Sequence, residues 1–131
     1  MKKYAFILLA FVFIVTAACK NDESKTAQIQ LISAEEMDTI LQMENVQLID
    51  VRTQDEYNSG HIEGAKNIVY LSDDWSEDIA KLDKDNPVYV YCAKGGRSAK
   101  CAALLAEAGF KKVYHLQGGI TQWKHEGKPL E

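Results

Sequence analysis

Hydrophobic and polar positions between residues 29 and 131 follow two alternating patterns. Short, continuous apolar runs, some rich in β-branched and aromatic residues, predict buried strands. Between them lie polar-faced or alanine-rich runs that begin at capping residues, and these predict helices. The expected strands are 29–32, 46–51, 67–71, 88–91 and 113–116, and the expected helices, with their capping residues, are 33–43, 53–58, 75–81, 98–108 and 120–126.

Local signals support this division. Ser33 is followed three residues later by Glu36, which is a capping box, and Gly109 suits the position after a helix end. Strands that alternate with helices at this spacing predict an α/β fold, with βαβ units and a parallel sheet covered on both faces. Ligands bind such sheets at the carboxyl ends of the strands, which here means the turns after Val51 and Tyr91.

Composition restricts the possible functions. A chain of 131 residues with 47% apolar residues is long enough for one domain with a core. The net charge of −4 offers no basic face for nucleic acid. The three cysteines form no CxxC pair, and His115 and His125 have no partner at metal-ligand spacing. We therefore expect no metal, no nucleotide cofactor and no nucleic-acid partner.

The first 18 residues read as a targeting segment. Lys2 and Lys3 precede an apolar run, 4–15. This run is too short to span a bilayer core, which requires roughly 20 residues. Small residues and Cys19 follow, which resembles the bacterial lipobox, in which the cysteine receives a lipid such as palmitate. The alternative is a plain secretory signal peptide with an incidental cysteine.

Residues 19–28 follow as the lipidated cysteine and a polar tether that lacks periodicity. The single domain, 29–131, would then lie outside the cytoplasm, where disulfides can persist. Lys20 after Cys19 resembles the sorting signal for the outer membrane.

The loop after Tyr91 carries the chemistry. Cys92 follows a buried strand, and Gly95 and Gly96 let the chain curl with successive N–H groups pointing inward. The helix that begins near Arg97 or Ser98 adds its positive end, and Lys94 adds a cation. These features predict a cradle for an anion centred on the Cys92 sulfur, with a lowered thiol pKa. The alternative is a buried, unreactive cysteine beside an ordinary turn.

Three motifs of this chain are similar to signatures of the rhodanese family of sulfurtransferases. The first is Asp50-Val51-Arg52 with Glu56-Tyr57 and the run 60–67, the second is the loop 92–98, and the third is Gly118-Gly119-Ile120 with Trp123. The resemblance covers residues 29–131. It implies a single rhodanese-like domain with a five-stranded, mainly parallel sheet flanked by helices.

The same resemblance implies a double displacement, in which Cys92 takes sulfane sulfur from a donor and passes it to a thiophilic acceptor. By resemblance, Cys92 is the nucleophile, and Ala93, Lys94, Gly95, Gly96, Arg97 and Ser98 bind its persulfide. Asp50, Arg52, Glu56 and His61 form a supporting shell. We expect Asp50 to fix backbone N–H groups and His61 to be a structural hydrogen-bonder. Arg52 would position the shell, or instead form a surface ion pair with Glu56.

The loop also bears on the substrate. Four residues separate Cys92 from Arg97, one fewer than in related phosphatases, and the smaller cradle favours a single sulfur over phosphate. Lys94 and Arg97 favour an anionic donor such as thiosulfate, and the acceptor would be a thiol or a cyanide-like nucleophile. A monomeric enzyme is expected. The alternatives are a sulfur-carrying or sensing module with little turnover, and an arsenate or phosphate ester hydrolase. Cys101 is read as a small core residue or as a resolving thiol.

Overall fold

Five parallel strands form one sheet in the order β1-β5-β4-β2-β3. The computed structural model describes residues 27–131. The predicted signal peptide, Cys19 and most of the predicted tether therefore lie outside the described residues. The strands are β1 (Gln28–Ile32), β2 (Gln47–Asp50), β3 (Lys66–Asn67), β4 (Val88–Tyr91) and β5 (Lys112–Leu116). The helices are α1 (Ala34–Leu41), α2 (Gln54–Asn58), α3 (Trp75–Ala80), α4 (Gly96–Glu107) and α5 (Gly119–His125).

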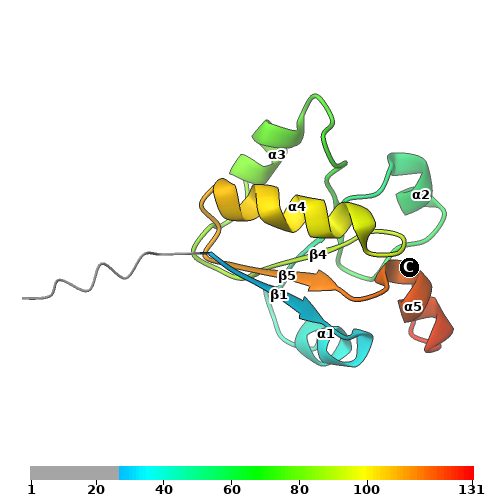
Figure 1. Ribbon diagram of the computed structural model, residues 1–131. Coiled ribbons are helices and arrows are strands. Elements are labelled where there is room, and N and C mark those ends of the chain that lie inside the picture. Colours follow the sequence, from blue (N-terminus) through cyan, green and yellow to red (C-terminus); the bar gives the residue numbers. More distant parts are fainter. Residues whose placement is uncertain (1–26) are drawn as a thin grey trace, which may run out of the picture.

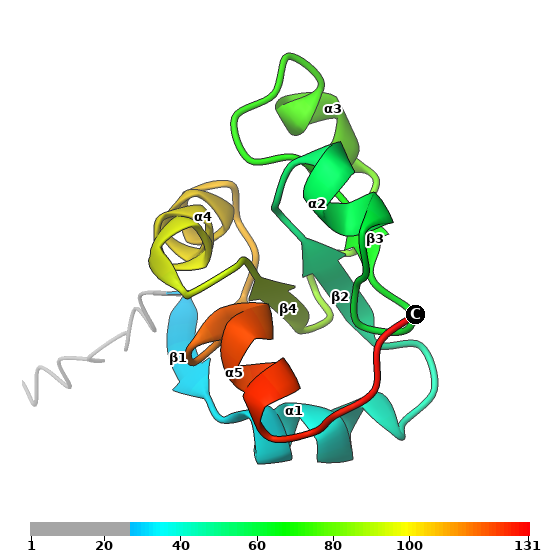
Figure 2. The ribbon, with the colours of Figure 1, turned by 90° about the vertical axis from the view of Figure 1, so that its right-hand side faces the viewer.

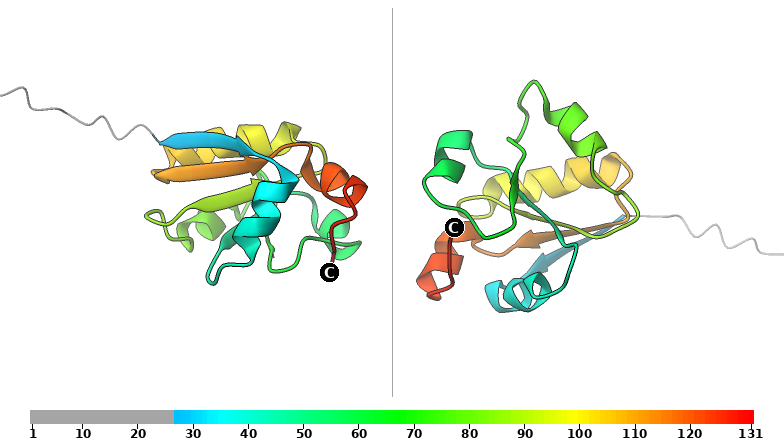
Figure 3. Two further views of the ribbon diagram at one scale, coloured as in Figure 1. Left: turned by 90° about the horizontal axis from the view of Figure 1, so that it is seen from below. Right: turned by 180° about the vertical axis from the view of Figure 1, so that it is seen from behind.

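Helices cover both faces of the sheet, as expected of a parallel sheet (Figures 1 and 3). Helices α3 and α4 pack with one apolar cluster, and α1 and α5 pack with the other. Neighbouring residues of β2 and β4 belong to different clusters, because successive side chains of a strand point to opposite faces. Thus Leu48 packs with α1 and α5, whereas Ile49 packs with α3 and α4. The predicted α/β fold is confirmed, and the sheet is wholly parallel.

Several element boundaries agree with the sequence. Strand β4 has the predicted limits, and both Ser33 and Thr53 form capping boxes with a glutamate three residues later. Helix α4 ends at Glu107, and Gly109 follows its C-cap with a positive φ of 98°. There Phe110 N–H bonds to Leu105 O and Gly109 N–H to Ala106 O. This is the Schellman pattern.

Other boundaries were wrong. Helix α4 begins at Gly96, two residues before the predicted start, because Gly95 serves as its N-cap in a left-handed conformation. Gln28 opens β1 instead of closing the tether. Helix α1 ends at Leu41, before the expected Met43.

Strand β3 is the largest difference, since it stops at Asn67 where the sequence predicted a strand over 67–71. The reason lies in Arg52, because a longer hydrogen-bond ladder between β2 and β3 would need its backbone N–H and C=O groups. Its N–H donates to the Asp50 carboxylate, and its carbonyl accepts from the Asn67 side-chain amide. Tyr70 N–H therefore bonds to Val51 O, out of register. Side chains thus end the ladder.

The carboxyl ends of the strands meet at one edge of the sheet, on the right of Figure 1. There the loop from β4 to α4 lies near α2 and the start of α5. Seen from that edge, the loop lies between the two helical layers (Figure 2). The C-terminal residue returns to the same region, where the backbones of Glu131 and His61 exchange two hydrogen bonds. The expected ligand-binding edge therefore carries residues from distant parts of the chain.

Candidate active site

Cys92 is the first residue after β4, and its side chain is buried under the loop that leads to α4. The loop can curl tightly because Gly95 has a φ of 109°, which favours glycine. No side chain caps α4, so its first N–H groups are free to face the sulfur. The local sequence therefore places Cys92 Sγ inside a ring of backbone N–H groups, as predicted.

Polar contacts to the sulfur come from three loop residues. Gly95 N–H donates to Cys92 Sγ at 3.0 Å, and Ser98 Oγ lies 3.5 Å from it. The backbone N–H groups of Lys94 and Ser98 also interact with the sulfur. Burial by itself raises the pKa of the Cys92 thiol, but these donors outweigh it and the pKa is lowered. The site therefore favours a thiolate, which is the nucleophilic form.

Arg97 belongs to the same turn, but its guanidinium faces α2. Its two terminal nitrogens bond to the two carboxylate oxygens of Glu56, each at 2.8 Å. These bonds lower the pKa of Glu56 to about 2, so the pair stays ionised at ordinary pH. The negative charge of a Cys92 thiolate also raises the pKa of Arg97, after the larger effect of Glu56. Within the loop, Lys94 is the exposed cation that has no carboxylate partner among the described residues.

The expected alternative of a surface ion pair between Arg52 and Glu56 was wrong. Arg52 is 4% exposed and pairs with the fully buried Asp50 at 2.6 Å. Its guanidinium also donates to Gly60 O at 2.8 Å. Asp50 accepts from the N–H of Arg52, as predicted for a residue that fixes neighbouring backbone. This pair therefore holds the turn after β2, beside the β4 loop.

His61 takes the structural place expected of it. Its Nδ1 lies 3.1 Å from Tyr57 O, its ring stacks on the Tyr57 ring at 3.7 Å, and its Nε2 lies 3.7 Å from the Glu131 carboxylate. These contacts link α2 to the C-terminal segment. No hydrogen bond or ion pair joins His61 to the Cys92 loop among the described residues, so its place in the predicted shell is indirect.

The sequence did not predict the part that α5 plays in the site. Ile120 N–H donates to Cys92 O at 2.9 Å, and Thr121 N–H donates to Ala93 O at 3.0 Å. Gly119, with a φ of 58°, lies directly against the same two carbonyl groups. The Gly118-Gly119 pair was the available signal, since two successive glycines permit a close approach of backbone to backbone.

Cys101 lies in the core, which was one of the two expectations for it. It is fully buried in α4, in the same apolar cluster as Cys92, and both cysteines are free. Burial, followed by the nearby Cys92, raises the pKa of Cys101 to about 12. Its thiol is therefore a poor nucleophile at neutral pH.

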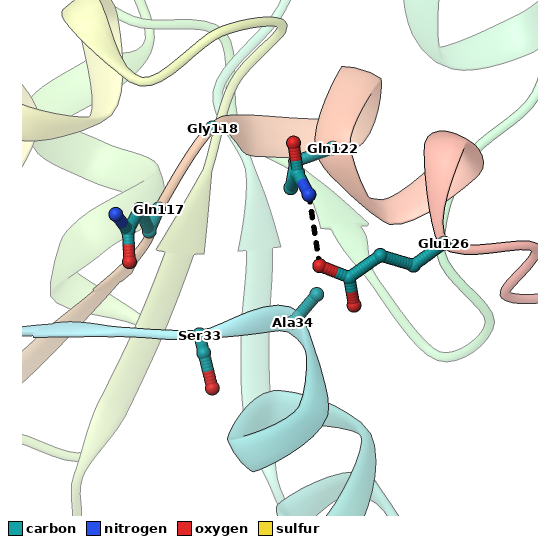
Figure 4. Close-up of a pocket in the computed structure, with 6 residues that line it drawn as sticks. All are labelled: Ser33, Ala34, Gln117, Gly118, Gln122 and Glu126. Atoms are coloured by element: carbon teal, nitrogen blue, oxygen red, sulfur yellow. Dashed lines mark hydrogen bonds between the residues drawn. The ribbon is translucent and has the colours of Figure 1, made fainter.

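A cavity of about 330 Å³ lies beside the site, between α5 and the turn from β1 to α1 (Figure 4). Gly118 connects this cavity to the Cys92 loop, because the backbone of Gly118 lies against Gly95. None of residues 92–98 lines this cavity, and Gln122 and Glu126 bond to each other across one wall. The candidate reactive sulfur, Cys92 Sγ, therefore belongs to the loop and not to this cavity.

Within residues 27–131, no group of three or more His, Cys, Asp and Glu side chains is arranged to hold a metal ion. The helices in that part of the chain are too short or too polar to cross a membrane.

Comparison with known proteins gives one consistent family. The model of the rhodanese-like domain matches residues 33–126. The chain is 35% identical over 95 residues to a thiosulfate sulfurtransferase GlpE of Shewanella oneidensis, covering 72% of this chain and 91% of that protein. A rhodanese-like domain protein from Staphylococcus aureus has a similar structure, with a TM-score of 0.67 and 33% identity over 78% of this chain and 96% of its own.

A longer relative matches over part of its length. The chain is 42% identical over 82 residues, or 63% of its length, to a probable adenylyltransferase/sulfurtransferase MoeZ of Mycobacterium tuberculosis. It spans only 21% of that protein.

Proposed function

The chain belongs to the rhodanese-like domain family, and from this membership and the geometry of the Cys92 loop we propose that it is a sulfurtransferase. The observation that carries the proposal is the ring of loop N–H groups around a buried sulfur with a lowered pKa. Such a ring stabilises an anion on that sulfur. Both a thiolate and a persulfide are anions of this kind.

The reaction would proceed in two displacements. The Cys92 thiolate attacks the outer sulfur of thiosulfate, a new S–S bond forms, and sulfite leaves with the electron pair of the broken S–S bond. The product is a Cys92 persulfide anion, whose terminal sulfur the loop N–H groups can hold. A nucleophile such as cyanide or a thiolate then attacks this terminal sulfur, and Cys92 leaves as the thiolate.

The charge around the loop supports an anionic donor to a limited extent. Glu56 engages the guanidinium of Arg97 through two hydrogen bonds, so Lys94 is left to attract an anion. A relative named thiosulfate sulfurtransferase favours thiosulfate as the donor. A persulfide or polysulfide donor would also suit the site, because each presents a sulfane sulfur and an anion.

Incubation with thiosulfate followed by intact-mass measurement tests the proposal. We expect a gain of one sulfur on the wild-type protein and none on Cys92→Ala, with thiocyanate formed after cyanide is added. Cys101→Ala is the matched control and should gain the sulfur. A persulfide without thiocyanate turnover would indicate a sulfur carrier instead, and no gain of sulfur from any sulfane donor would contradict both functions.

A phosphatase activity has less support. Four residues lie between Cys92 and Arg97, and the guanidinium that would bind phosphate oxygens is bonded to Glu56. An aryl phosphate should therefore release no phosphate.

We also propose that Cys19 is lipidated and anchors the domain outside the cytoplasm, with the outer membrane as the expected location. The support is the sequence of residues 1–20 alone. Mass spectrometry of the protein purified from its host membrane would detect acyl chains on Cys19. A mature chain that begins elsewhere, or carries no lipid, would contradict the anchor without affecting the sulfurtransferase.

A further inference from the structure

The loop that holds the sulfur has a second face, turned away from Cys92 Sγ and covered by α5. On this face the carbonyl of Cys92 accepts from Ile120 N–H at 2.9 Å, and the carbonyl of Ala93 accepts from Thr121 N–H at 3.0 Å. The bonds join two segments that are far apart in the sequence, and both carbonyls belong to residues at the start of the catalytic loop.

The geometry of the peptide bond connects this face to the sulfur. In a trans peptide the C=O and the N–H of one plane point in opposite directions, and the described residues contain no cis peptide. Ala93 C=O and Lys94 N–H share one plane. With the carbonyl held by Thr121, the N–H is turned to the other side, where it interacts with Cys92 Sγ. The Gly95 N–H that donates at 3.0 Å follows one residue later.

Gly119 makes this contact possible. A Cβ at this position would lie 2.4 Å from Cys92 O, 2.5 Å from Ala93 O and 2.6 Å from Ala93 C. All three atoms are backbone atoms, so no flexible side chain could move aside. Any larger residue must push the loop and α5 apart.

We propose that Gly119, with the N–H groups of Ile120 and Thr121, is a positioning device for the sulfur site: it holds the loop carbonyls from behind and so aims the loop N–H groups at Cys92. These residues touch no substrate. They act on the reaction through the thiolate and the persulfide. Only the effect of these residues on sulfur transfer rests on the proposed function. Their effect on the reactivity of the Cys92 thiol can be measured without any sulfur transfer.

The test is the pH dependence of Cys92 alkylation by iodoacetamide in Gly119→Ala. The matched control is Gly127→Ala, which also replaces a glycine of positive φ (72°) but meets no atom within 4 Å. Misaligning one N–H bond to an ionised group should raise the midpoint of the alkylation profile by about one to two pH units. The control should keep the wild-type midpoint. A folded Gly119→Ala protein with an unchanged midpoint would overturn the proposal.

A measurement on the wild-type protein covers the case in which Gly119→Ala does not fold. Charge on Cys92 should polarise the loop peptides and the bonds behind them. The amide resonances of Ile120 and Thr121 should therefore shift with the Cys92 titration, whereas that of Gly127 should not. The shifts should vanish in Cys92→Ala. Amides of Ile120 and Thr121 that do not respond to Cys92 would refute the positioning role. If they respond but no sulfur is ever transferred, only the proposed function fails.

Discussion

Replacing Ser98 by alanine isolates the one side chain that hydrogen-bonds to Cys92 Sγ within residues 27–131. Ser98 is fully buried, and its Oγ lies 3.5 Å from Cys92 Sγ and 3.1 Å from Gly95 O. In the thiol form, Cys92 donates to Ser98 Oγ, and the Ser98 hydroxyl donates to Gly95 O. A thiolate has no proton to donate, so the hydroxyl must turn from Gly95 O towards the sulfur in order to stabilise it.

This exchange of hydrogen bonds sets the size of the expected change in the pKa of Cys92. A hydrogen bond to an ionised group is worth about 1.5–3 kcal/mol, and the neutral bond given up is worth about 1 kcal/mol. The net stabilisation of the thiolate by Ser98 is then about 0.5–2 kcal/mol. Since one pKa unit corresponds to about 1.4 kcal/mol, Ser98→Ala should raise the pKa of Cys92 by roughly one unit. The N–H donors of Lys94 and Gly95 remain and limit the change.

Stopped-flow alkylation of Cys92 between pH 5 and 10 provides the assay. The rate follows the thiolate fraction, so the midpoint should move up by about one unit and the rate below it should fall about tenfold. Ser76→Ala, on the exposed surface of α3, is the matched control and should leave the profile unchanged. A midpoint that stays in place or moves down in folded Ser98→Ala would show that the backbone alone stabilises the thiolate.

Three further predictions concern a buried ion pair, a partly exposed ion pair and a buried thiol. Arg52→Met leaves the fully buried Asp50 without its ionic partner, and urea denaturation should show that the free energy of unfolding falls by about 3–5 kcal/mol. Lys81→Met, which breaks an exposed pair, is the control and should lower it by less than about 1 kcal/mol. A small loss for Arg52→Met would mean that Asp50 is solvated. Glu56 has its pKa lowered from 4.5 to about 2 in the folded protein, so its contribution is present above about pH 4.5 and is lost as the pH falls towards 2. Because Glu56 and Arg97 are each about a third exposed, solvent screening limits that contribution to about 1 kcal/mol, and the stabilities of wild type and Glu56→Gln should converge near pH 2; a constant difference down to pH 2 would exclude the charge as its source. In the native protein, Cys101 should resist alkylation at pH 8, because it is fully buried and has a pKa of about 12; modification of Cys101 at a rate close to that of Cys92 would contradict its place in the core.

The sequence predicted those parts of the molecule that depend on local interactions. The capping box at Ser33 and the helix cap at Thr53 require only residues three positions apart, and the β-branched and aromatic run of β4 needs only its own side chains. The position of Cys92 at the sheet edge followed from the alternation of strands and helices. Each of these features could therefore be predicted before the packing was known.

The pairing of charges depends on packing, and the ion pair predicted from spacing along the chain was wrong. Arg52 and Glu56 are four residues apart, yet Arg52 turns inward to Asp50, and Glu56 faces Arg97 across 41 positions of the chain. The same limit explains β3, whose ladder is ended by the side chains of Asp50 and Asn67. Separation along the chain gave no signal for these contacts.

The charge pairing also bears on which ligand the loop would select in the proposed function. Lys94 and Arg97 were both expected to attract an anion, but the planar guanidinium of Arg97 is already used by Glu56 in the bidentate geometry that suits carboxylates and phosphates. The donors that remain around Cys92 are backbone N–H groups and the Ser98 hydroxyl, which lie close to a single sulfur atom. Such donors can hold a singly charged terminal sulfur, whereas a tetrahedral phosphate would also need the occupied fork of Arg97. In the proposed reaction, selection for sulfur would thus rest on the short loop and on Glu56 together, and Glu56 would act from α2 through Arg97 without touching Cys92 Sγ.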